Sequence, residues 1–314
     1  MINFYDDGFY RNIMNYHFII NGIIFGGAIP DILGEMSNMD KKKDLKVVDR
    51  LWLWGHPAGS HNNQYGLVGE SHITPAEAAD YMGIRNVMMV HYGADPKPPF
   101  DKWSKPLAKF DRVVWSIEGG GGEDVDAALE LANTLPNLQG LLMDDYFGRV
   151  PHQAENVPTD TTENFAESGA FSLKALQQLR GRLNNIKKPL DLWVVLYTHE
   201  FEMANLRSHL DLCDVVMMWT WVANNLVNLE KNFARLEELA ANNRKILGLY
   251  MYDYGAGKPM PVDLMELQCE TGLRWLKEGR IDGMIFLASC ISDLGLDAVE
   301  WSKRWIAKVG EQQI

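Results

Sequence analysis

The sequence predicts an α/β fold in which a single-domain (β/α)8 barrel, a TIM barrel, follows an N-terminal extension. Two observations predict it: eight short apolar or aromatic runs recur from residue 50 onward, and helix-patterned segments lie between most of them. Strands that are apolar on both faces and alternate with helices pair in parallel. Eight such units favour closure into a barrel. The absence of a glycine-rich dinucleotide fingerprint after the first run disfavours an open, doubly wound sheet.

The expected strands are runs of aliphatic and aromatic residues that are too short for helices. Each run ends in polar or aromatic residues, which places a ring of such side chains at one end of the barrel. The runs are "RLWLWGH" (50–56), "NVMMVHYG" (86–93), "RVVWSIEGG" (112–120), "LQGLLMDDYFG" (138–148), "LDLWVVLYTHE" (190–200), "CDVVMMWTW" (213–221), "KILGLYMYDYG" (245–255) and "GMIFLASC" (283–290).

The expected helices carry apolar residues at three- and four-residue spacing. The first opens with a capping box, in which Thr74 is the N-cap, Pro75 the first helical residue and Glu77 the third, and it ends at Gly83. The longest stretch without periodicity, 149–163, follows the fourth strand and is expected to form a long loop over the site. The remaining helices are expected at 123–135, 171–183, 226–243, 262–279 and 298–309.

The composition is that of an ordinary globular protein, with 46% hydrophobic and 23% charged residues among 314. A net charge of -12 disfavours nucleic acid and anionic membranes as partners, because both are bound mainly by Lys- and Arg-rich surfaces. Cys213, Cys269 and Cys290 are widely spaced and odd in number, so they predict buried thiols rather than disulfides or a zinc site. No pattern indicates an oligomeric state.

The N-terminal extension is assigned to residues 1–48 and the barrel to 49–314. The apolar segment 18–29 is too short to span a membrane and resembles the hydrophobic part of a secretory signal. Only one basic residue, Arg11, precedes it, and no convincing cleavage site follows. Periplasmic or secreted and cytoplasmic locations therefore both stay open.

Barrel enzymes place their chemistry at the C-terminal ends of the strands, so the last residues of each run form the candidate site. Acids lie there beside indoles and phenols, a combination that suits a sugar, because aromatic rings stack on its C–H face while polar groups bond its hydroxyls. The ring comprises His56, His91, Tyr92, Glu118, Asp144, Asp145, Tyr197, His199, Glu200, Trp219, Trp221, Tyr252, Asp253, Tyr254 and Ser289.

Two carboxylates of this ring are the candidate catalytic pair, since glycosidic cleavage needs an acid and a base or nucleophile. Asp145 is the expected acid/base, and Asp144 is expected to raise the pKa of Asp145 by like-charge proximity or to orient the substrate. The partner carboxylate stays open among Glu118, Glu200 and Asp253. Adjacent strand residues point to opposite faces, so one of the two aspartates is expected to face the barrel axis. Strand ends often twist enough to present both side chains, so this second arrangement stays open.

Eight further residues are expected to bind the substrate. Trp219 and Trp221 differ by two positions and share a strand face, so at least one indole is expected at the mouth of the barrel as a platform for a sugar. The other expected substrate-binding residues are His56, His91, Tyr92, Tyr197, His199 and Tyr252.

The eight-strand register, "LLMDDYF" (141–147) on the fourth strand and the Trp- and Tyr-rich strand ends together resemble glycoside-hydrolase-like (β/α)8 barrels. The resemblance covers roughly residues 50–310 and implies a carbohydrate-active site. No family signature matches in full. The chitinase-type D-x-x-D-x-D-x-E pattern is interrupted by Asn137 and Gln139 and lacks its closing Glu. The Asn-Glu pair and the seventh-strand Glu of other barrels are replaced by Asp-Asp and Asp253.

The leading hypothesis is therefore a glycoside hydrolase that acts on a neutral or amino-containing oligosaccharide or glycoside without a metal or other cofactor. A first alternative is a metal-dependent sugar isomerase or hydrolase. Its divalent ion would be held by Glu118, Asp145, His199 and Asp253. A second is a catalytically silent carbohydrate-binding barrel.

Overall fold

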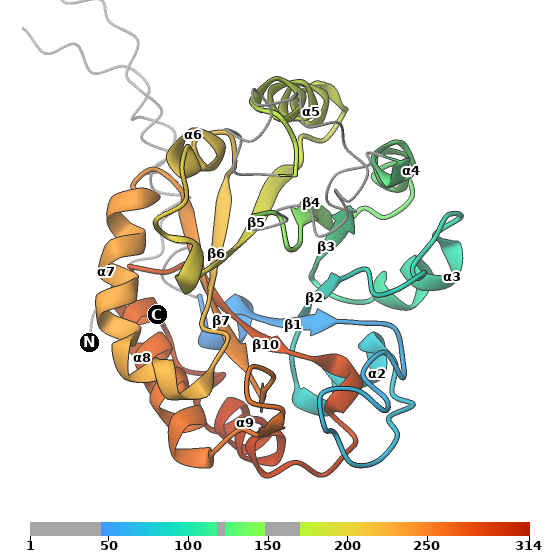
Figure 1. Ribbon diagram of the computed structural model, residues 1–314. Coiled ribbons are helices and arrows are strands. Elements are labelled where there is room, and N and C mark those ends of the chain that lie inside the picture. The colour runs from blue at the N-terminus through green and yellow to red at the C-terminus, as the bar shows by residue number, and fades with distance from the viewer. Residues whose placement is uncertain (1–44, 118–122, 148–169) are drawn as a thin grey trace, which may run out of the picture. The chain divides into compact units, whose positions relative to one another are not determined.

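The computed structural model describes residues 45–117, 123–147 and 170–314, and in them a closed parallel barrel forms in the order β1-β10-β7-β6-β5-β4-β3-β2 (Figure 1). Each predicted strand is present, so the predicted TIM barrel is confirmed. The strands are β1 (Leu51–Gly55), β2 (Asn86–Met89), β3 (Arg112–Ile117), β4 (Leu138–Met143), β5 (Asp191–Tyr197), β6 (Val215–Trp219), β7 (Arg244–Tyr250) and β10 (Gly283–Leu287).

Helices surround the barrel on the outside (Figure 1). Two short ones, α3 and α6, were not expected from periodicity. The small two-stranded sheet of β8 (Tyr252–Asp253) and β9 (Lys258–Pro259) follows β7. The helices are α2 (Pro75–Met82), α3 (Asp101–Ser104), α4 (Glu123–Leu131), α5 (Leu173–Asn185), α6 (Leu206–Leu210), α7 (Leu229–Leu239), α8 (Val262–Lys277) and α9 (Asp297–Val309).

The start of α2 confirms its predicted capping box. The Thr74 side chain accepts a hydrogen bond from the Glu77 backbone N–H, and the Glu77 carboxylate accepts one from the Thr74 backbone N–H. Gly83 ends the helix with a φ of 70°, a left-handed conformation that glycine adopts without steric cost. These two signals fix the helix that links β1 to β2.

Several sequence-based expectations fall outside the described residues: the apolar segment 18–29, the loop 149–163 and Glu118. The compact unit that contains the barrel begins at Leu45. Within the described ranges, no helix combines the length and apolar character that a membrane span requires. The three cysteines are buried free thiols, as expected.

The barrel interior is packed by large side chains. A Cβ on Gly248 of β7 would lie only 2.2 Å from the Trp219 ring, so glycine at this position admits the indole. The Trp219 ring packs against Trp54 at a centroid distance of 5.3 Å and against Tyr250 at 4.8 Å. Layers of this kind fill the inside of a barrel and support the residues above them.

Charged residues gather at the N-terminal ends of the strands, around a cavity of about 50 Å³. Arg244 Nη2 lies 2.7 Å from Asp191 Oδ1, and the Arg112 guanidinium lies over the Trp52 ring at 4.8 Å. Burial and the nearby guanidinium of Arg50 lower the pKa of Arg112 to about 10. The charged residues that line this cavity are Arg50, Arg112, Arg244, Asp191 and Asp282.

Candidate active site

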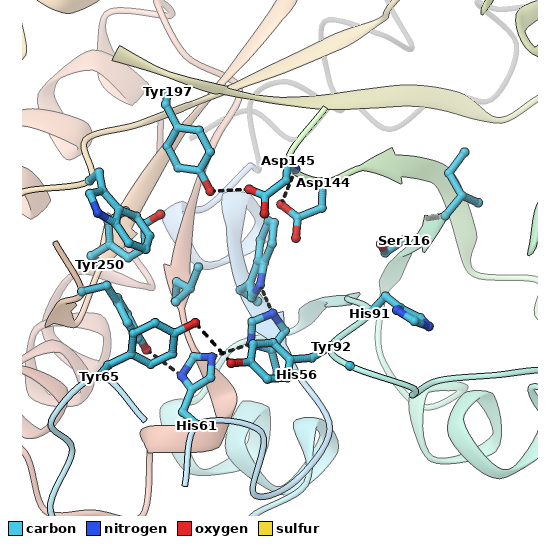
Figure 2. Close-up of a pocket in the computed structure, with 16 residues that line it drawn as sticks. His56, His61, Tyr65, His91, Tyr92, Ser116, Asp144, Asp145, Tyr197 and Tyr250 are labelled. Atoms are coloured by element: carbon cyan, nitrogen blue, oxygen red, sulfur yellow. Dashed lines mark hydrogen bonds between the residues drawn. The ribbon is translucent and has the colours of Figure 1, made fainter. Parts of the chain in front are cut away.

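A larger cavity of about 290 Å³ opens at the opposite, C-terminal end of the barrel (Figure 2). Residues at or just beyond the end of every barrel strand contribute to its wall. The lining residues are Trp54, His56, His61, Tyr65, His91, Tyr92, Gly93, Ser116, Ile117, Asp144, Asp145, Tyr197, Trp221, Tyr250, Tyr254 and Leu287. This is the place where barrel enzymes carry their catalytic groups.

Asp144 and Asp145 both line the cavity, which is the second of the two arrangements that the sequence left open. The reason is that β4 ends at Met143 and the chain turns there, with a φ of 45° at Asp145. Asp tolerates this left-handed conformation better than most residues. The Asp145 backbone N–H donates to Asp144 Oδ1 at 2.9 Å. The turn thus presents two adjacent carboxyl groups to one cavity.

Tyr197, at the end of β5, holds the side chain of Asp145. Its hydroxyl donates to Asp145 Oδ1 at 2.9 Å. Burial, followed by the nearby Tyr250, Asp144 and Asp145, raises the pKa of Tyr197 well above its ordinary value. The phenol therefore stays protonated, and it acts as a hydrogen-bond donor that orients the carboxyl group of Asp145.

The opposite side of the cavity carries a buried pair of histidines (Figure 2). His56 Nδ1 lies 3.0 Å from His61 Nε2, and the Trp54 indole N–H donates to His56 Nε2 at 2.8 Å. The Tyr254 hydroxyl lies 3.0 Å from His61 Nδ1. Burial lowers the pKa of His61 to about 4, and burial together with His61 lowers the pKa of His56. Both imidazoles are neutral at physiological pH.

Two tyrosines lie beside these histidines. The Tyr92 hydroxyl hydrogen-bonds to Gln64 Oε1 and lies 3.2 Å from the Tyr65 hydroxyl. Because an amide oxygen only accepts, Tyr92 is the donor toward Gln64, and Tyr65 is then the donor toward Tyr92. The protons of both hydroxyls are thus used within the protein.

Two predicted partner carboxylates lie outside the cavity wall. Glu200 is buried, and its carboxylate accepts the Tyr197 backbone N–H at 2.8 Å. Burial raises the pKa of Glu200 to about 7. Asp253 Oδ1 accepts the backbone N–H groups of Ala223 and Ala256, both at 3.2 Å, so it supports the loops after β6 and β7. Glu118, the third candidate, lies outside the described residues.

The two predicted tryptophans have different positions. Trp221 lines the cavity with its ring stacked on Tyr254 at a centroid distance of 6.2 Å. Trp219 is 1% exposed and packs inside the barrel, so its predicted role as a sugar platform is wrong. The indole enters the space that Gly248 leaves open, and that glycine belongs to the neighbouring strand.

The remaining predicted residues divide in the same way. His56, His91, Tyr92 and Tyr197, four of the residues predicted to bind substrate, line the cavity. Tyr252 does not, because its hydroxyl donates to the backbone oxygen of Tyr65 at 3.0 Å. His199 is exposed and stacks on the Tyr197 ring at a centroid distance of 5.3 Å outside the cavity wall. Ser289 is buried and donates to the backbone oxygen of His56 at 3.0 Å.

Sequence reasoning missed five polar or aromatic lining residues of this cavity. His61 and Tyr65 belong to the irregular segment after β1, where no periodicity marks them. Trp54, Ser116 and Tyr250 are among the last two residues of β1, β3 and β7, where apolar neighbours hide them. Ser116 Oγ is buried without a hydrogen-bond partner among the described residues. Each follows or ends a barrel strand, and this place in the chain was the one available signal.

One group of potential metal ligands exists in the described ranges. Side-chain ligand atoms of His56, His61 and Cys290 lie within 4.8 Å of one another. Both His56 ring nitrogens already have hydrogen-bond partners, and burial raises the pKa of the Cys290 thiol to about 12. The described members of the metal set predicted from the sequence, Asp145, His199 and Asp253, are not brought together.

The sequence matches no family model and no curated protein sequence. In structure, the chain is similar to a Bacteroides thetaiotaomicron protein assigned as an α-L-fucosidase, with a TM-score of 0.52, 8% identity, and 85% of this chain and 98% of that chain covered. It is also similar to a xylanase-A-amylase inhibitor protein, with a TM-score of 0.50 and 11% identity, and 83% of this chain and 98% of that chain are covered. For a family GH18 chitinase from Cycas revoluta the TM-score is 0.47 and the identity 14%, and 81% of this chain and 99% of that chain are covered.

The likenesses to the first two of these structures show the fold alone. The chain has the closed (β/α)8 architecture that they share, and it matches no family model. At such low identities, however, a shared fold does not transfer an activity, and one of these similar proteins is described as an inhibitor. The function therefore has to be argued from the residues around the cavity.

Proposed function

We propose that the protein is a glycoside hydrolase in which Asp145 is the general acid/base. The observation that carries this proposal is the pair of carboxyl groups at the end of β4, which face a cavity walled by phenol and indole rings. Asp145 is exposed toward ligand and its orientation is held by Tyr197. Rings and carboxylates around one small cavity are what recognition and cleavage of a sugar require.

The proposed reaction uses the two aspartates in different roles. Asp145 gives its proton to the oxygen of the glycosidic bond as the bond to the sugar carbon breaks, while a water molecule adds to that carbon. The proton lost by the water returns to a carboxylate, so the pair ends as it began. Asp144 lies next to this acid, where its charge stabilises the positive charge that develops on the sugar ring.

The proposed substrate is a glycoside with one sugar ring seated in the cavity. A volume of about 290 Å³ lies at the small end of ligand pockets, which suits a single ring better than a long chain. Trp221 and Tyr254 offer the stacked aromatic surface for its C–H face. Longer chains would extend out of the mouth.

A screen of 4-nitrophenyl glycosides and natural oligosaccharides with product detection tests this proposal. On any substrate that is cleaved, we expect Asp145→Asn to lower kcat by at least about 10²-fold, the usual contribution of a general acid. The matched control is Asp191→Asn, which alters an aspartate at the other end of the barrel and leaves kcat unchanged. Unfolding temperatures of both variants check that the barrel is intact.

Three results would contradict the proposal. An unchanged kcat in Asp145→Asn would remove the acid/base role from this residue. Loss of activity in EDTA, with recovery on addition of a divalent metal, would favour the metal-dependent isomerase or hydrolase. Sugar binding in calorimetry without product from any substrate would favour the non-catalytic carbohydrate-binding barrel.

A further inference from the structure

The histidine side of the cavity contains a continuous series of hydrogen bonds. It runs from the barrel interior to the cavity wall with separations of 2.8, 3.0 and 3.0 Å. Every side chain in it is at least nine-tenths buried. In order, its members are Trp54, His56, His61 and Tyr254.

The first member fixes the direction of the whole series, because an indole N–H can only donate. His56 Nε2 must therefore be unprotonated, and the proton of the neutral ring lies on Nδ1. That N–H faces His61 Nε2, which must then accept, so His61 also carries its proton on Nδ1. The imidazole charge states follow from the same geometry, since an extra proton on either ring would point at another N–H.

The direction decides what Tyr254 offers to a ligand. Its oxygen accepts the N–H of His61, and its own proton remains. In the part of the chain that the structure describes, the Tyr254 hydroxyl has no second hydrogen-bond partner, whereas the protons of Tyr65 and Tyr92 are used within the protein. Tyr254 is the residue of this series that stacks with Trp221 on the cavity wall.

We propose that Trp54 orders this series so that Tyr254 is a fixed hydrogen-bond donor to an uncharged oxygen of the substrate, and that the site selects neutral over anionic sugars. This inference rests on the proposed function and names the substrate class of the same site. The oxygen is a hydroxyl, a ring oxygen or a carbonyl. Trp54, His56 and His61 act through Tyr254 and are positioning residues.

The charges around the cavity support the exclusion of anionic sugars. No Lys or Arg is found among the described residues that line it, and the charge proposed for Asp144 repels a carboxylate or sulfate. Of the three histidines on the wall, the buried pair cannot supply positive charge, because an extra proton would meet the Trp54 N–H at His56 and the His56 N–H at His61. The other titratable groups that face the pair are Tyr65, Tyr92, Tyr254 and the Cys290 thiol. Burial raises the pKa of Tyr92, Tyr254 and Cys290, so these three groups are neutral at physiological pH.

Imidazole ¹⁵N NMR of the full chain tests the series without a substrate. We expect His56 and His61 to carry their protons on Nδ1 and to show no titration between pH 5 and 8, where an unperturbed histidine titrates. Trp54→Phe removes the indole N–H and keeps an aromatic ring. In this variant His56 is expected to populate the other tautomer and to titrate at higher pH than in the wild type.

Trp52→Phe is the matched control. It removes a buried indole from the same strand, and that indole packs against Trp193 at a centroid distance of 5.2 Å instead of against the histidines. The histidine signals should be unchanged in this variant. The series is refuted if either wild-type imidazole is protonated on Nε2 or charged at pH 7. It is also refuted if Zn²⁺ binds stoichiometrically at His56 and His61 in the wild type.

Matched glycoside pairs test the substrate class, namely 4-nitrophenyl glucoside against glucuronide and galactoside against galacturonide. We expect kcat/KM of the neutral member to exceed that of the acid by at least about 10-fold. Tyr254→Phe should lower kcat/KM for the neutral member by about 2- to 10-fold, the net worth of one neutral hydrogen bond. Tyr81→Phe, which removes a phenol hydroxyl on α2 outside the cavity, is the control.

The outcomes separate the two proposals. A preference for the acidic glycosides, or an unchanged kcat/KM in Tyr254→Phe, would overturn the substrate class while leaving the glycosidase proposal intact. If no glycoside is cleaved, the proposed function and the substrate class that rests on it both fail. The NMR experiment then still decides whether the ordered series exists.

Discussion

The two ends of the barrel differ in which charged side chains they carry. At the N-terminal end, three arginines and two aspartates line a cavity of about 50 Å³, and Arg244 pairs with Asp191 at 2.7 Å. At the C-terminal end, two aspartates and three histidines line a cavity of about 290 Å³, with no Lys or Arg among its described lining residues. The same parallel strands supply both sets of side chains.

We infer from this difference that one end of the barrel serves stability and the other the proposed chemistry. At the N-terminal end, arginines and aspartates in contact offset each other's charge. This charged cluster therefore holds the strand ends together and leaves little uncompensated charge to attract a ligand. At the C-terminal end, Asp145 accepts a hydrogen bond from the Tyr197 phenol, and the buried imidazoles of His56 and His61 stay neutral. Carboxyl groups in such surroundings keep the capacity to exchange protons with a substrate.

The largest expected effect is a loss of stability on removal of the Trp219 indole, compared with removal of the Trp221 indole. Trp219→Ala removes a ring that is 1% exposed in the barrel interior, and we expect the free energy of unfolding to fall by about 3–5 kcal/mol. Trp221→Ala alters the cavity wall and should instead weaken sugar binding by about 0.5–1.5 kcal/mol beyond the area lost. Denaturant unfolding and calorimetric sugar titration measure the two quantities.

These two variants are controls for each other, because both remove an indole from the end of β6 or the residues after it. A large stability loss in Trp221→Ala with unchanged binding would mean that its ring is part of the core. Equal binding losses in both variants would mean that Trp219 reaches the ligand. Either result would contradict the assignment of packing to the barrel interior and of ligand recognition to the cavity wall.

The fold could be predicted from the sequence, because the spacing of apolar residues and the residues that begin and end helices specify it. Apolar runs, helical spacing and the capping box at Thr74 each act over a few residues, and neighbouring residues are visible in the chain. The sequence was also sufficient to place Asp144 and Asp145 at the end of β4. It did not show that both face the cavity, since that depends on the left-handed turn at Asp145.

The errors at the site have a common physical cause. Asp253 and Trp219 were expected at the site because they lie near strand ends. Their roles, however, depend on partners far away in sequence: the backbone N–H of Ala223 for the acid and the space left by Gly248 for the indole. His61 was missed for the converse reason. Its importance arises only from contact with Tyr254, nearly two hundred residues away.

A smaller effect, of about 2 kcal/mol, is expected from the titration of Glu200 at the upper end. The pKa of this carboxyl group rises to about 7 in the folded protein because the group is buried. The folded chain therefore keeps a proton that the unfolded chain loses near pH 4.5. The stability that Glu200 contributes is complete below that pH and is lost as the pH rises to about 7.

Glu200→Gln isolates this contribution, because the amide is neutral at every pH and its oxygen still accepts the Tyr197 N–H. We expect the unfolding free energy of the variant minus that of the wild type to increase by about 2 kcal/mol between pH 5 and pH 7. The difference is needed because His61, with a lowered pKa, gains stability over the same rise in pH. A difference that is constant with pH would show that Glu200 is already ionised at pH 5.

The smallest effect is expected at the lower end, from the ion pair between Arg244 and Asp191. Both side chains are partly exposed, at 46% and 32%, so water screens the attraction between them. Asp191→Asn should lower the free energy of unfolding by about 0.2–1 kcal/mol at low salt, and the difference from the wild type should shrink in 1 M NaCl. Arg112 and Arg50 line the same cavity, and removal of one carboxylate leaves their positive charges less compensated. The expected loss therefore lies in the upper part of that range.

Turnover should not change in Asp191→Asn, because the substitution lies at the end of the barrel away from the cavity of Asp144 and Asp145. A loss of several kcal/mol, or a loss independent of salt, would show that the lower cluster is desolvated like the upper site, and the contrast between the two ends would no longer hold.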